Sequence, residues 1–217
     1  MTDRPRRFAV PFDPEYFGQR ARSGQAMSNL EAFRHIHATN LWAGPESRSG
    51  LGAGHDQTAA LRAQLPALLA RRGVRSLLDL PCGDGRWMAT VDLGDIRYLG
   101  ADLLPELIAD NARRHAAPGR DFRVLDLLAS PLPAVDLVLC RDCLVHLSFA
   151  DIARAVANLR RSGSRWLLTT TFPAQNVNED VVTGDWRPIN LQAAPFDWPA
   201  PEELLVEQCT EADGRFA

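Results

Sequence analysis

The sequence contains no lysine, so its 24 basic residues are all arginines. Its four cysteines are too few and too scattered for a disulfide scaffold, which predicts a reducing cytoplasm as its location. No run of about 18 apolar residues is present, and we therefore expect no helix that crosses a membrane. Because no apolar stretch of signal-peptide length follows the first arginines, we expect the protein to stay in the compartment where it is made.

The formal net charge of -3 does not favour a nucleic-acid partner, since binding to a phosphate backbone needs a dense basic surface. Hydrophobic residues make up 46% and charged residues 24% of the chain, which is the usual mixture of a globular protein. A chain of 217 residues is long enough to bury a full core as one domain with a small appended cap.

The first 72 residues show helical patterns with one irregular interruption. Asp13 is typical of a helix start, and a second helix is expected over Gln25 to Ala38. The segment Asn40 to Gly54 is rich in glycine and serine and predicts a loop. A third helix is expected from about Asp56, because leucines recur there at helical spacing. We assign residues 1–72 to an N-terminal helical cap with a lid loop, which is the segment Asn40 to Gly54.

Residues 73–217 alternate short apolar runs with helical patterns, which is typical of strands and helices that follow one another. Strands are predicted at Ser76 to Leu80, Ile96 to Ala101, Phe122 to Leu125, Val135 to Cys140 and Arg165 to Thr171. Helices are predicted at Arg86 to Val91, Pro105 to Ala116 and Phe149 to Arg161. The strand runs show little alternation, as expected of parallel strands covered on both faces. The predicted fold class is therefore α/β, with a doubly wound, mostly parallel sheet.

A long stretch rich in proline, tryptophan and asparagine follows the fifth predicted strand. An irregular segment of this length often covers a binding site, so we assign residues 172–201 to a substrate loop. Its aromatic residues Trp186, Phe196 and Trp198 would form an apolar acceptor pocket or pack the loop onto the sheet. One further strand is predicted at Glu203 to Thr210.

The turn after the first predicted strand is the most informative segment. Two glycines one residue apart, Gly83 and Gly85, lie between an apolar strand and a helical pattern. In a doubly wound sheet, ligands bind beyond the carboxyl ends of the strands, and glycine lets the backbone approach a ligand closely. A dinucleotide site prefers a third glycine three residues later, where this sequence has Met88, and this argues against a nicotinamide cofactor.

Acidic residues stand at the ends of the next two predicted strands. Asp102 lies 19 residues after Gly83, where a carboxylate can accept hydrogen bonds from both hydroxyls of a ribose. Asp126 follows the third strand, where a carboxylate can accept from an adenine amine. The simpler interpretations are a helix cap for Asp102 and an ordinary loop acid for Asp126. Together with Asp79 in the first strand, these acids stand at three strand ends in register. That arrangement is a more specific sign of a nucleotide-type ligand than any one acid alone.

From Leu77 to Thr171 the chain resembles class I S-adenosylmethionine-dependent methyltransferases. The first motif of that family is an acid followed by a spaced run of three glycines. It corresponds here to Asp79, Pro81, Gly83 and Gly85, with proline at the first glycine position. The resemblance implies a Rossmann-like fold and S-adenosylmethionine as cofactor, with S-adenosylhomocysteine as product. It also implies that the residues of this motif lie beside the amino-acid part of the cofactor.

The same resemblance implies the remaining cofactor contacts. Asp102 would hold the ribose, and Asp126 with Leu127 would border the adenine. The other expected contacts are Leu103, Arg141 and Trp42.

Two further segments resemble one bacterial subgroup of this family, and we associate no firm substrate with it. They run from Asn40 to Thr58 and from Gly184 to Leu191. In that subgroup the chain continues into a final strand after the region that corresponds to 214–216. We therefore expect the seventh strand to be absent or truncated.

Methyl transfer requires that a nucleophile be aligned with the methyl group, and it requires a general base only if the nucleophile is protonated. His146 is the candidate base, and Asp142 would orient its imidazole if the two share a helical turn. A packing or capping role without proton chemistry is the alternative for His146. Cys140 and Cys143 form a C-x-x-C pair, but a zinc site would need a second pair, so we expect no metal.

We predict a cytoplasmic methyltransferase that acts on a small-molecule acceptor. A protein or peptide acceptor, a nicotinamide-dependent oxidoreductase on the same architecture and a cofactor-binding module without turnover are the alternatives. The oxidoreductase is disfavoured because a chain without lysine has no Tyr-Lys pair. We expect no membrane or nucleic-acid partner, and the sequence leaves the oligomeric state open.

Overall fold

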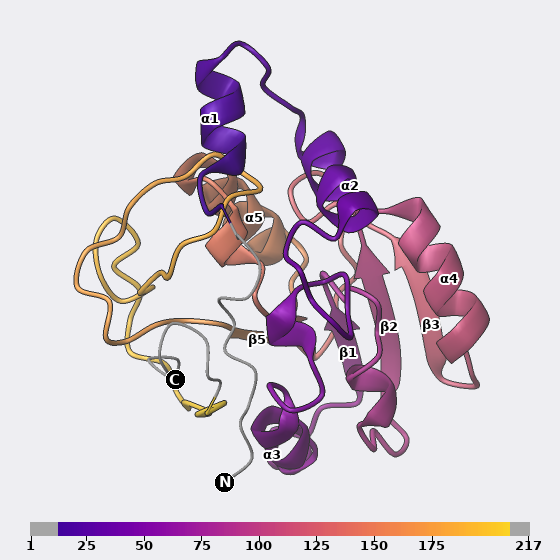
Figure 1. Ribbon diagram of the computed structural model, residues 1–217. Helices are drawn as coiled ribbons and strands as arrows, with labels where there is room; N and C mark the ends of the chain where they lie inside the picture. The colour runs from indigo at the N-terminus through magenta and orange to yellow at the C-terminus, as the bar shows by residue number, and fades with distance from the viewer. Residues whose placement is uncertain (1–12, 209–217) are drawn as a thin grey trace, which may run out of the picture.

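The computed structural model describes residues 13–208 (Figure 1). Its centre is a five-stranded sheet in the order β3-β2-β1-β4-β5, in which all neighbouring strands are parallel. The strands are β1 (Ser76–Asp79), β2 (Arg97–Asp102), β3 (Arg120–Val124), β4 (Leu137–Cys140) and β5 (Trp166–Thr169). The strand order reverses direction between β1 and β4, and in doubly wound sheets ligands bind beyond the carboxyl ends of the strands at that point.

Five α-helices and three short 3-10 turns surround the sheet within this part of the chain. The α-helices are α1 (Tyr16–Arg22), α2 (Asn29–Thr39), α3 (Ala59–Arg71), α4 (Pro105–His115) and α5 (Phe149–Arg161). The 3-10 turns are η2 (Leu51–Ala53), η3 (Met88–Thr90) and η4 (Leu144–His146). No helix between residues 13 and 208 is both long enough and apolar enough to cross a membrane.

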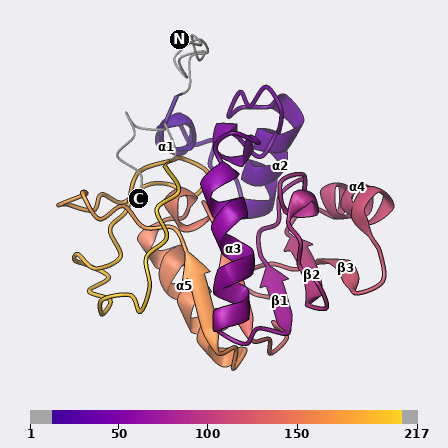
Figure 2. The ribbon, with the colours of Figure 1, turned by 90° about the horizontal axis from the view of Figure 1, so that it is seen from below.

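The two faces of the sheet carry separate hydrophobic cores, because successive residues of a strand point to opposite faces. Leu77 of β1 packs with the leucines of α3, whereas the next residue, Leu78, packs with Ile152 and Leu159 of α5. Figure 2 shows α3 and α5 on different sides of the strands. The central strands are therefore covered on both faces, as the fully buried, apolar β4 requires, whereas the edge strand β3 is largely exposed.

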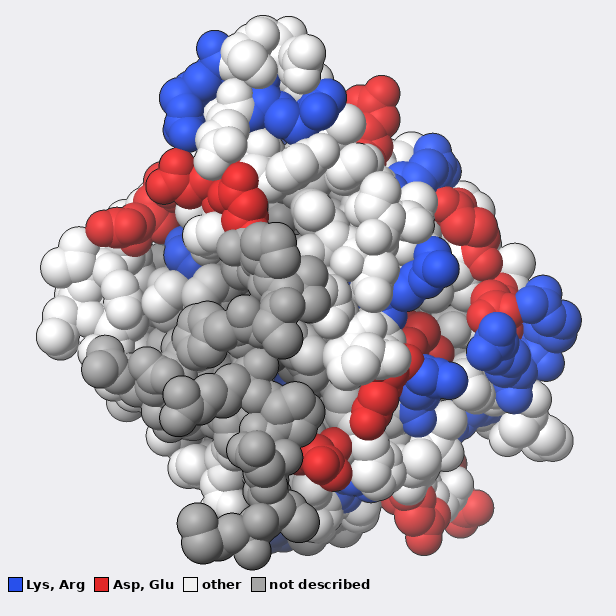
Figure 3. All heavy atoms as spheres, viewed as in Figure 1, with Lys and Arg blue, Asp and Glu red and all other residues white. Residues whose placement is uncertain are grey.

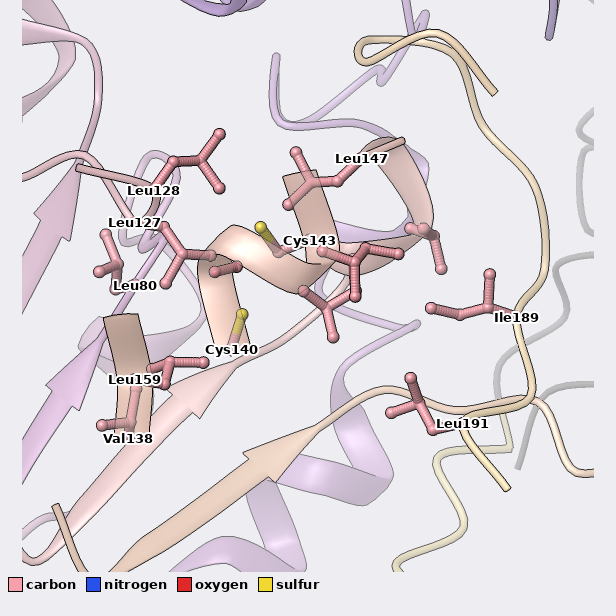
Figure 4. Close-up of a cluster of buried hydrophobic side chains, with 14 of the residues drawn as sticks. Leu80, Leu127, Leu128, Val138, Cys140, Cys143, Leu147, Leu159, Ile189 and Leu191 are labelled. Atoms are coloured by element: carbon pink, nitrogen blue, oxygen red, sulfur yellow. The ribbon is translucent and has the colours of Figure 1, made fainter. Parts of the chain in front are cut away.

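The predicted substrate loop, 172–201, contains neither a helix nor a strand. It is nevertheless part of the core, since Ile189 and Leu191 are buried in the cluster that includes Val138 and Leu159. Figure 4 shows the two loop residues beside the side chains of that cluster. The loop is thus anchored next to the strand ends rather than extended into solvent.

The five predicted strands and the doubly wound parallel sheet are confirmed, with ends that shift by a few residues. The predicted helix over Gln25 to Ala38 begins only at Asn29, because Ser28 forms a capping box with Glu31. The helix from Asp56 is confirmed as α3, which begins at Ala59.

The predicted helix at Arg86 to Val91 is wrong, since only the 3-10 turn η3 forms there. Trp87, Met88 and Val91 are buried and Arg86, Ala89 and Thr90 are exposed, which is the pattern that suggested a helix. A turn at Asp92, whose carboxylate accepts from the backbone N–H of Gly94, follows at once and leaves room for a single turn.

The predicted strand at Glu203 to Thr210 is also wrong in the part that the structure describes, up to residue 208. Residues there follow α3 instead of joining the sheet. The carboxylate of Glu203 pairs with Arg71 and Arg72, and the carbonyl of Val206 accepts from Gln64 Nε2 at 3.3 Å. The region expected to lead to the seventh strand, 214–216, lies outside the described residues.

The N-terminal helices α1 and α2 share a small core of their own, in which Phe17, Ala32 and Ile36 are buried. Helix α3, by contrast, packs on the sheet. The assignment of 1–72 to a cap and 73–217 to the α/β domain stays a prediction.

Charges of both signs are interspersed over α4 and its neighbours (Figure 3). Asp110 pairs with Arg113 and Arg114 on α4, and Arg34 of α2 pairs with Glu106 at 2.9 Å. The last of these pairs joins the helical N-terminal region to the α/β part, although exposed ion pairs of this kind contribute little to stability.

Candidate active site

A cavity of about 1150 Å³, including its open mouth, lies at the carboxyl ends of β1, β2 and β4. Every residue predicted from the sequence to bind the cofactor or to act in catalysis lines it, with the exception of Gly85. A Cβ at Gly85 would instead meet His115 at 3.4 Å and Asn111 at 3.7 Å on α4. Gly85 therefore supports the turn from behind rather than facing the cavity.

The turn after β1 is held from three sides. The backbone N–H of Gly83 donates to Asp102 Oδ2 at 3.2 Å, and its carbonyl accepts from Asn111 Nδ2 at 2.7 Å. From the lid loop, Ser49 Oγ accepts from the backbone N–H of Asp84 at 3.2 Å. A Cβ at Gly83, whose φ is +54°, would lie 2.6 Å from that same hydroxyl. Only glycine therefore fits the closely packed lid and turn.

Asp102 ends β2 with a carboxylate that is 8% exposed. One oxygen accepts from Gly83 N–H and the other from Leu104 N–H, each at 3.2 Å. Burial raises the pKa of Asp102 to about 6, even though these hydrogen bonds favour the ionised form. A carboxylate offers about four acceptor positions, so the side chain retains capacity for the two hydroxyls of a ribose.

Asp79 ends β1 and is almost fully buried. Its Oδ2 accepts from the hydroxyl of Tyr98 at 2.8 Å. Burial raises the pKa of Asp79 to about 7, and the Tyr98 hydrogen bond opposes that rise. Asp126, after β3, is half-buried, and its Oδ1 accepts from the N–H of Leu128 at 2.7 Å. The three acids at the strand ends thus converge on one cavity.

His146 closes the cavity beyond β4 and is 8% exposed. Its Nδ1 lies 3.0 Å from the backbone carbonyl of Asp185, and its ring stacks on Trp42 with centroids 4.1 Å apart. Because a carbonyl oxygen only accepts, Nδ1 carries the proton, and Nε2 of the neutral ring holds the lone pair. The imidazole is therefore fixed in the tautomer that a general base at Nε2 needs.

The helical turn expected to bring Asp142 and His146 together does not form. Asp142 has φ +48°, which interrupts a right-handed helix, and η4 begins only at Leu144. The carboxylate of Asp142 pairs with Arg141 at 3.0 Å, and it is Asp185 that bonds the imidazole at Nδ1. Sequence reasoning missed Asp185 because it lies 39 residues from His146. The only signal was the Gly184 to Leu191 segment, which had no assigned role.

Arg141 is buried in the cavity wall and is extensively paired. Its Nε and Nη2 donate to the two carboxylate oxygens of Glu207 at 2.8 and 2.7 Å, and Nη2 also reaches the carbonyl of Gly52 at 3.0 Å. Arg141 therefore ties the lid loop and Glu207 to the end of β4. Sequence reasoning also missed Glu207, which no motif indicates.

A second arginine of the cavity wall, Arg48, comes from the lid loop. Its Nη1 donates to the carbonyls of His37 and Ala38, at 3.2 and 3.3 Å. Its Nε and Nη2 make no hydrogen bond to any residue within 13–208. Arg48, unlike Arg141, therefore keeps donors for a ligand.

Acidic residues outnumber arginines in the cavity wall. The acids are Asp79, Asp84, Asp102, Asp126 and Asp142, and the arginines are Arg48 and Arg141. Such a wall suits a ligand with positive groups.

The cysteines of the C-x-x-C pair are both free and buried. The bond to Cys140 and burial raise the pKa of the Cys143 thiol, so this pair is poorly suited to thiolate chemistry.

Residues 78–163 match the family model of the methyltransferase domain. No curated protein matches the sequence. Solved structures similar to the chain include the sugar N-methyltransferase KedS8 from Streptoalloteichus sp, at 26% identity and a TM-score of 0.46 over 59% of this chain and 54% of that one. They also include CalS10, an amino pentose methyltransferase from Micromonospora echinaspora, at 25% identity and a TM-score of 0.43 over 57% and 54%.

The chain therefore spans little more than half the length of these two structures. The family match covers the end of β1 and all of β2, β3 and β4, with the three acidic strand ends that line the cavity. Together, the sheet order and this match identify residues 78–163 as the core of a class I, S-adenosylmethionine-dependent methyltransferase domain.

Proposed function

We propose that the protein transfers a methyl group from S-adenosylmethionine to a small-molecule acceptor and that His146 is the general base. The observation that carries the proposal is one cavity that joins a glycine turn and buried acids at one end to a fixed imidazole at the other. When bound, S-adenosylmethionine supplies an activated methyl group. The protein has to bind it, align the acceptor and accept a proton.

The residues of the cavity fit this cofactor. Asp102 would accept from the ribose hydroxyls, since its two backbone hydrogen bonds leave acceptor positions open. Asp126, Leu127 and Leu103 would border the adenine, and the turn at Gly83 would face the amino-acid part. The acidic wall suits the sulfonium and ammonium groups of S-adenosylmethionine. It disfavours a dinucleotide, whose two phosphates bring negative charge to the same place.

We assign the carboxylate of the cofactor to Arg48 rather than to Arg141. The guanidinium of Arg141 is already paired with Glu207 and Asp142. Arg48 lines the same cavity and retains its Nε and Nη2 donors among the described residues. An arginine presents a fork of N–H donors that matches a carboxylate.

A small acceptor is supported by the character of the remaining wall. Phe33, Ile36, Trp42 and Leu147 give it apolar and aromatic surfaces, with His146 among them. Concave sites with apolar and aromatic walls and a few polar groups are typical of small-molecule sites. At this end, Nε2 of His146 accepts the proton that the acceptor loses as its bond to the methyl group forms. The cytoplasmic location stays a prediction.

Calorimetry tests the cofactor before any acceptor is known. We expect S-adenosylhomocysteine and S-adenosylmethionine to bind, NADH not to bind, and Asp102→Ala to weaken both adenosyl ligands. Preference for NADH, or no adenosyl binding by folded protein, would overturn the proposal.

An acceptor screen then tests the role of His146 as the general base. His146→Ala should lower turnover far more than cofactor affinity, and unchanged turnover would remove His146 from that role.

A further inference from the structure

The 3-10 turn that carries His146 is held by a segment far along the chain, Thr183–Arg187. The backbone N–H of Gly184 donates to the carbonyl of His146 at 2.8 Å, and that of Arg187 donates to Val145 at 3.1 Å. A turn of three residues can satisfy few of its own backbone groups. The distant segment satisfies them instead.

The guanidinium of Arg187 holds both ends of the same turn. Nη1 donates to the carbonyl of Leu144 at 2.8 Å and Nη2 to that of Leu147 at 2.6 Å. A third bond runs from Nε to the carbonyl of Glu179 at 3.1 Å. Arg187 is only 5% exposed, and a buried cation is costly unless its donors are used. Its position thus depends on the carbonyls of this turn.

Asp185 joins the turn to helix α1. Its backbone carbonyl accepts from Nδ1 of His146, whereas its carboxylate accepts from the N–H groups of Phe17 and Gly18 at 2.7 and 2.8 Å. Figure 1 shows the loop after β5 passing beside α1. At Gly184, with φ +109°, a Cβ would lie 2.6 Å from the ring of Phe17, so α1 and the segment are in close contact.

We propose that Thr183–Arg187 is a positioning clamp for His146. It fixes the turn through Arg187 and Gly184, selects the Nδ1–H tautomer through the Asp185 carbonyl, and links the docking of α1 to the orientation of the imidazole. The proposal rests on the proposed function for its catalytic meaning. Its structural content, the tautomer and its dependence on the clamp, can be measured without cofactor or acceptor.

Nitrogen-15 NMR of the histidine rings provides that measurement. We expect wild-type His146 to show the Nδ1–H tautomer. In Arg187→Lys, which keeps the charge but loses the fork of donors, the ratio of Nδ1–H to Nε2–H should fall about fivefold to tenfold, as for the loss of one hydrogen bond. Arg160→Lys is the matched control, because Arg160 is exposed on α5. Its ratio should stay at the wild-type value.

Asp185→Ala and Asp185→Asn test the link to α1. Alanine should shift the tautomer ratio in the same direction, and asparagine, which retains a carbonyl acceptor for one of the two N–H groups, should restore part of it. A wild-type Nε2–H tautomer, or ratios unchanged in Arg187→Lys and Asp185→Ala, would overturn the clamp. Binding of S-adenosylhomocysteine is measured on the same samples to separate failure of the clamp from failure of the proposed function. If the wild-type protein did not bind this ligand, the proposed function alone would be overturned.

Discussion

The indole of Trp42 lies 4.1 Å, centroid to centroid, from the imidazole of His146, and the two ring planes are inclined by 23°. Trp42 follows α2, whereas His146 ends the 3-10 turn after β4. The N-terminal helical region thus contributes directly to the wall of the cavity. Between them, this stack and the Asp185 carbonyl fix the plane and the tautomer of the ring.

The stack should be measurable as a coupling energy. In a double-mutant cycle of Trp42→Ala and His146→Ala, we expect the free energies of unfolding to deviate from additivity by about 1 kcal/mol, as for other ring pairs. Denaturant unfolding of the four proteins provides the measurement. A cycle with Trp42→Phe in place of Trp42→Ala should give a smaller deviation from additivity, because phenylalanine keeps a ring beside His146. Additive effects throughout would show that the two rings do not stabilise each other.

Asp102 makes cofactor binding dependent on pH. The ionised carboxylate accepts ribose hydroxyls, and its pKa is raised to about 6 by burial. The dissociation constant for S-adenosylhomocysteine should therefore rise as the pH falls below about 6, by at most tenfold per pH unit. In Asp102→Asn this dependence should disappear and binding should be weak at every pH. Calorimetry from pH 5 to pH 8 would show a flat wild-type profile if Asp102 had no part in binding.

Asp79 should make the free protein less stable as the pH rises. Its pKa in the folded state is raised to about 7 from 3.8 by burial, so folding favours the protonated form. The stabilisation is complete below about pH 4 and is lost as the pH rises through about 7. The free energy of unfolding should fall by a few kcal/mol over this range. Asp79→Asn keeps an acceptor for Tyr98 and removes the titration. Urea unfolding should therefore show converging stabilities at low pH and a more stable variant at pH 8.

Gly83→Ala separates backbone strain from the contact with the lid. Gly83 and Gly73 have φ values of +54° and +63°, but only at Gly83 would a Cβ meet a neighbour, Ser49 Oγ. Backbone strain alone should cost about 1 kcal/mol of stability for alanine at either position, and Gly83→Ala should cost more because of the contact with Ser49. Only Gly83→Ala should also weaken S-adenosylhomocysteine, because the lid and turn have to separate. Equal affinity in the two variants would argue against a role for this close contact in the site.

Arg48→Ala tests which arginine receives the cofactor carboxylate. We expect S-adenosylhomocysteine to bind about tenfold to a hundredfold more weakly, the usual loss for a hydrogen bond to a charged group. Binding of 5'-methylthioadenosine, which lacks the amino-acid part, should not change. Arg160→Ala is the control for the loss of an exposed arginine. If both ligands weakened equally, Arg48 would be holding the lid loop rather than the carboxylate.

The sequence by itself determined the α/β sheet and the group of acids in the cavity. Every strand except β3, which contains Arg120, Asp121 and Arg123, lies in a short, mainly apolar run that can be recognised locally in the sequence. Asp79 and Asp102 end β1 and β2, and Asp126 follows β3. Because the carboxyl ends of parallel strands share one edge of the sheet, the acids had to converge there once the strands were parallel.

Only the tertiary structure decided how the chemistry of the site is held. Asp142 lies four residues before His146 but pairs with Arg141, whereas the backbone of Asp185, 39 residues away, bonds the imidazole. Glu207 reaches Arg141 across 66 residues in the same way. Periodicity reports which residues share a face of one helix or strand. It contains no information on which irregular segment packs against another, and these contacts all join irregular segments.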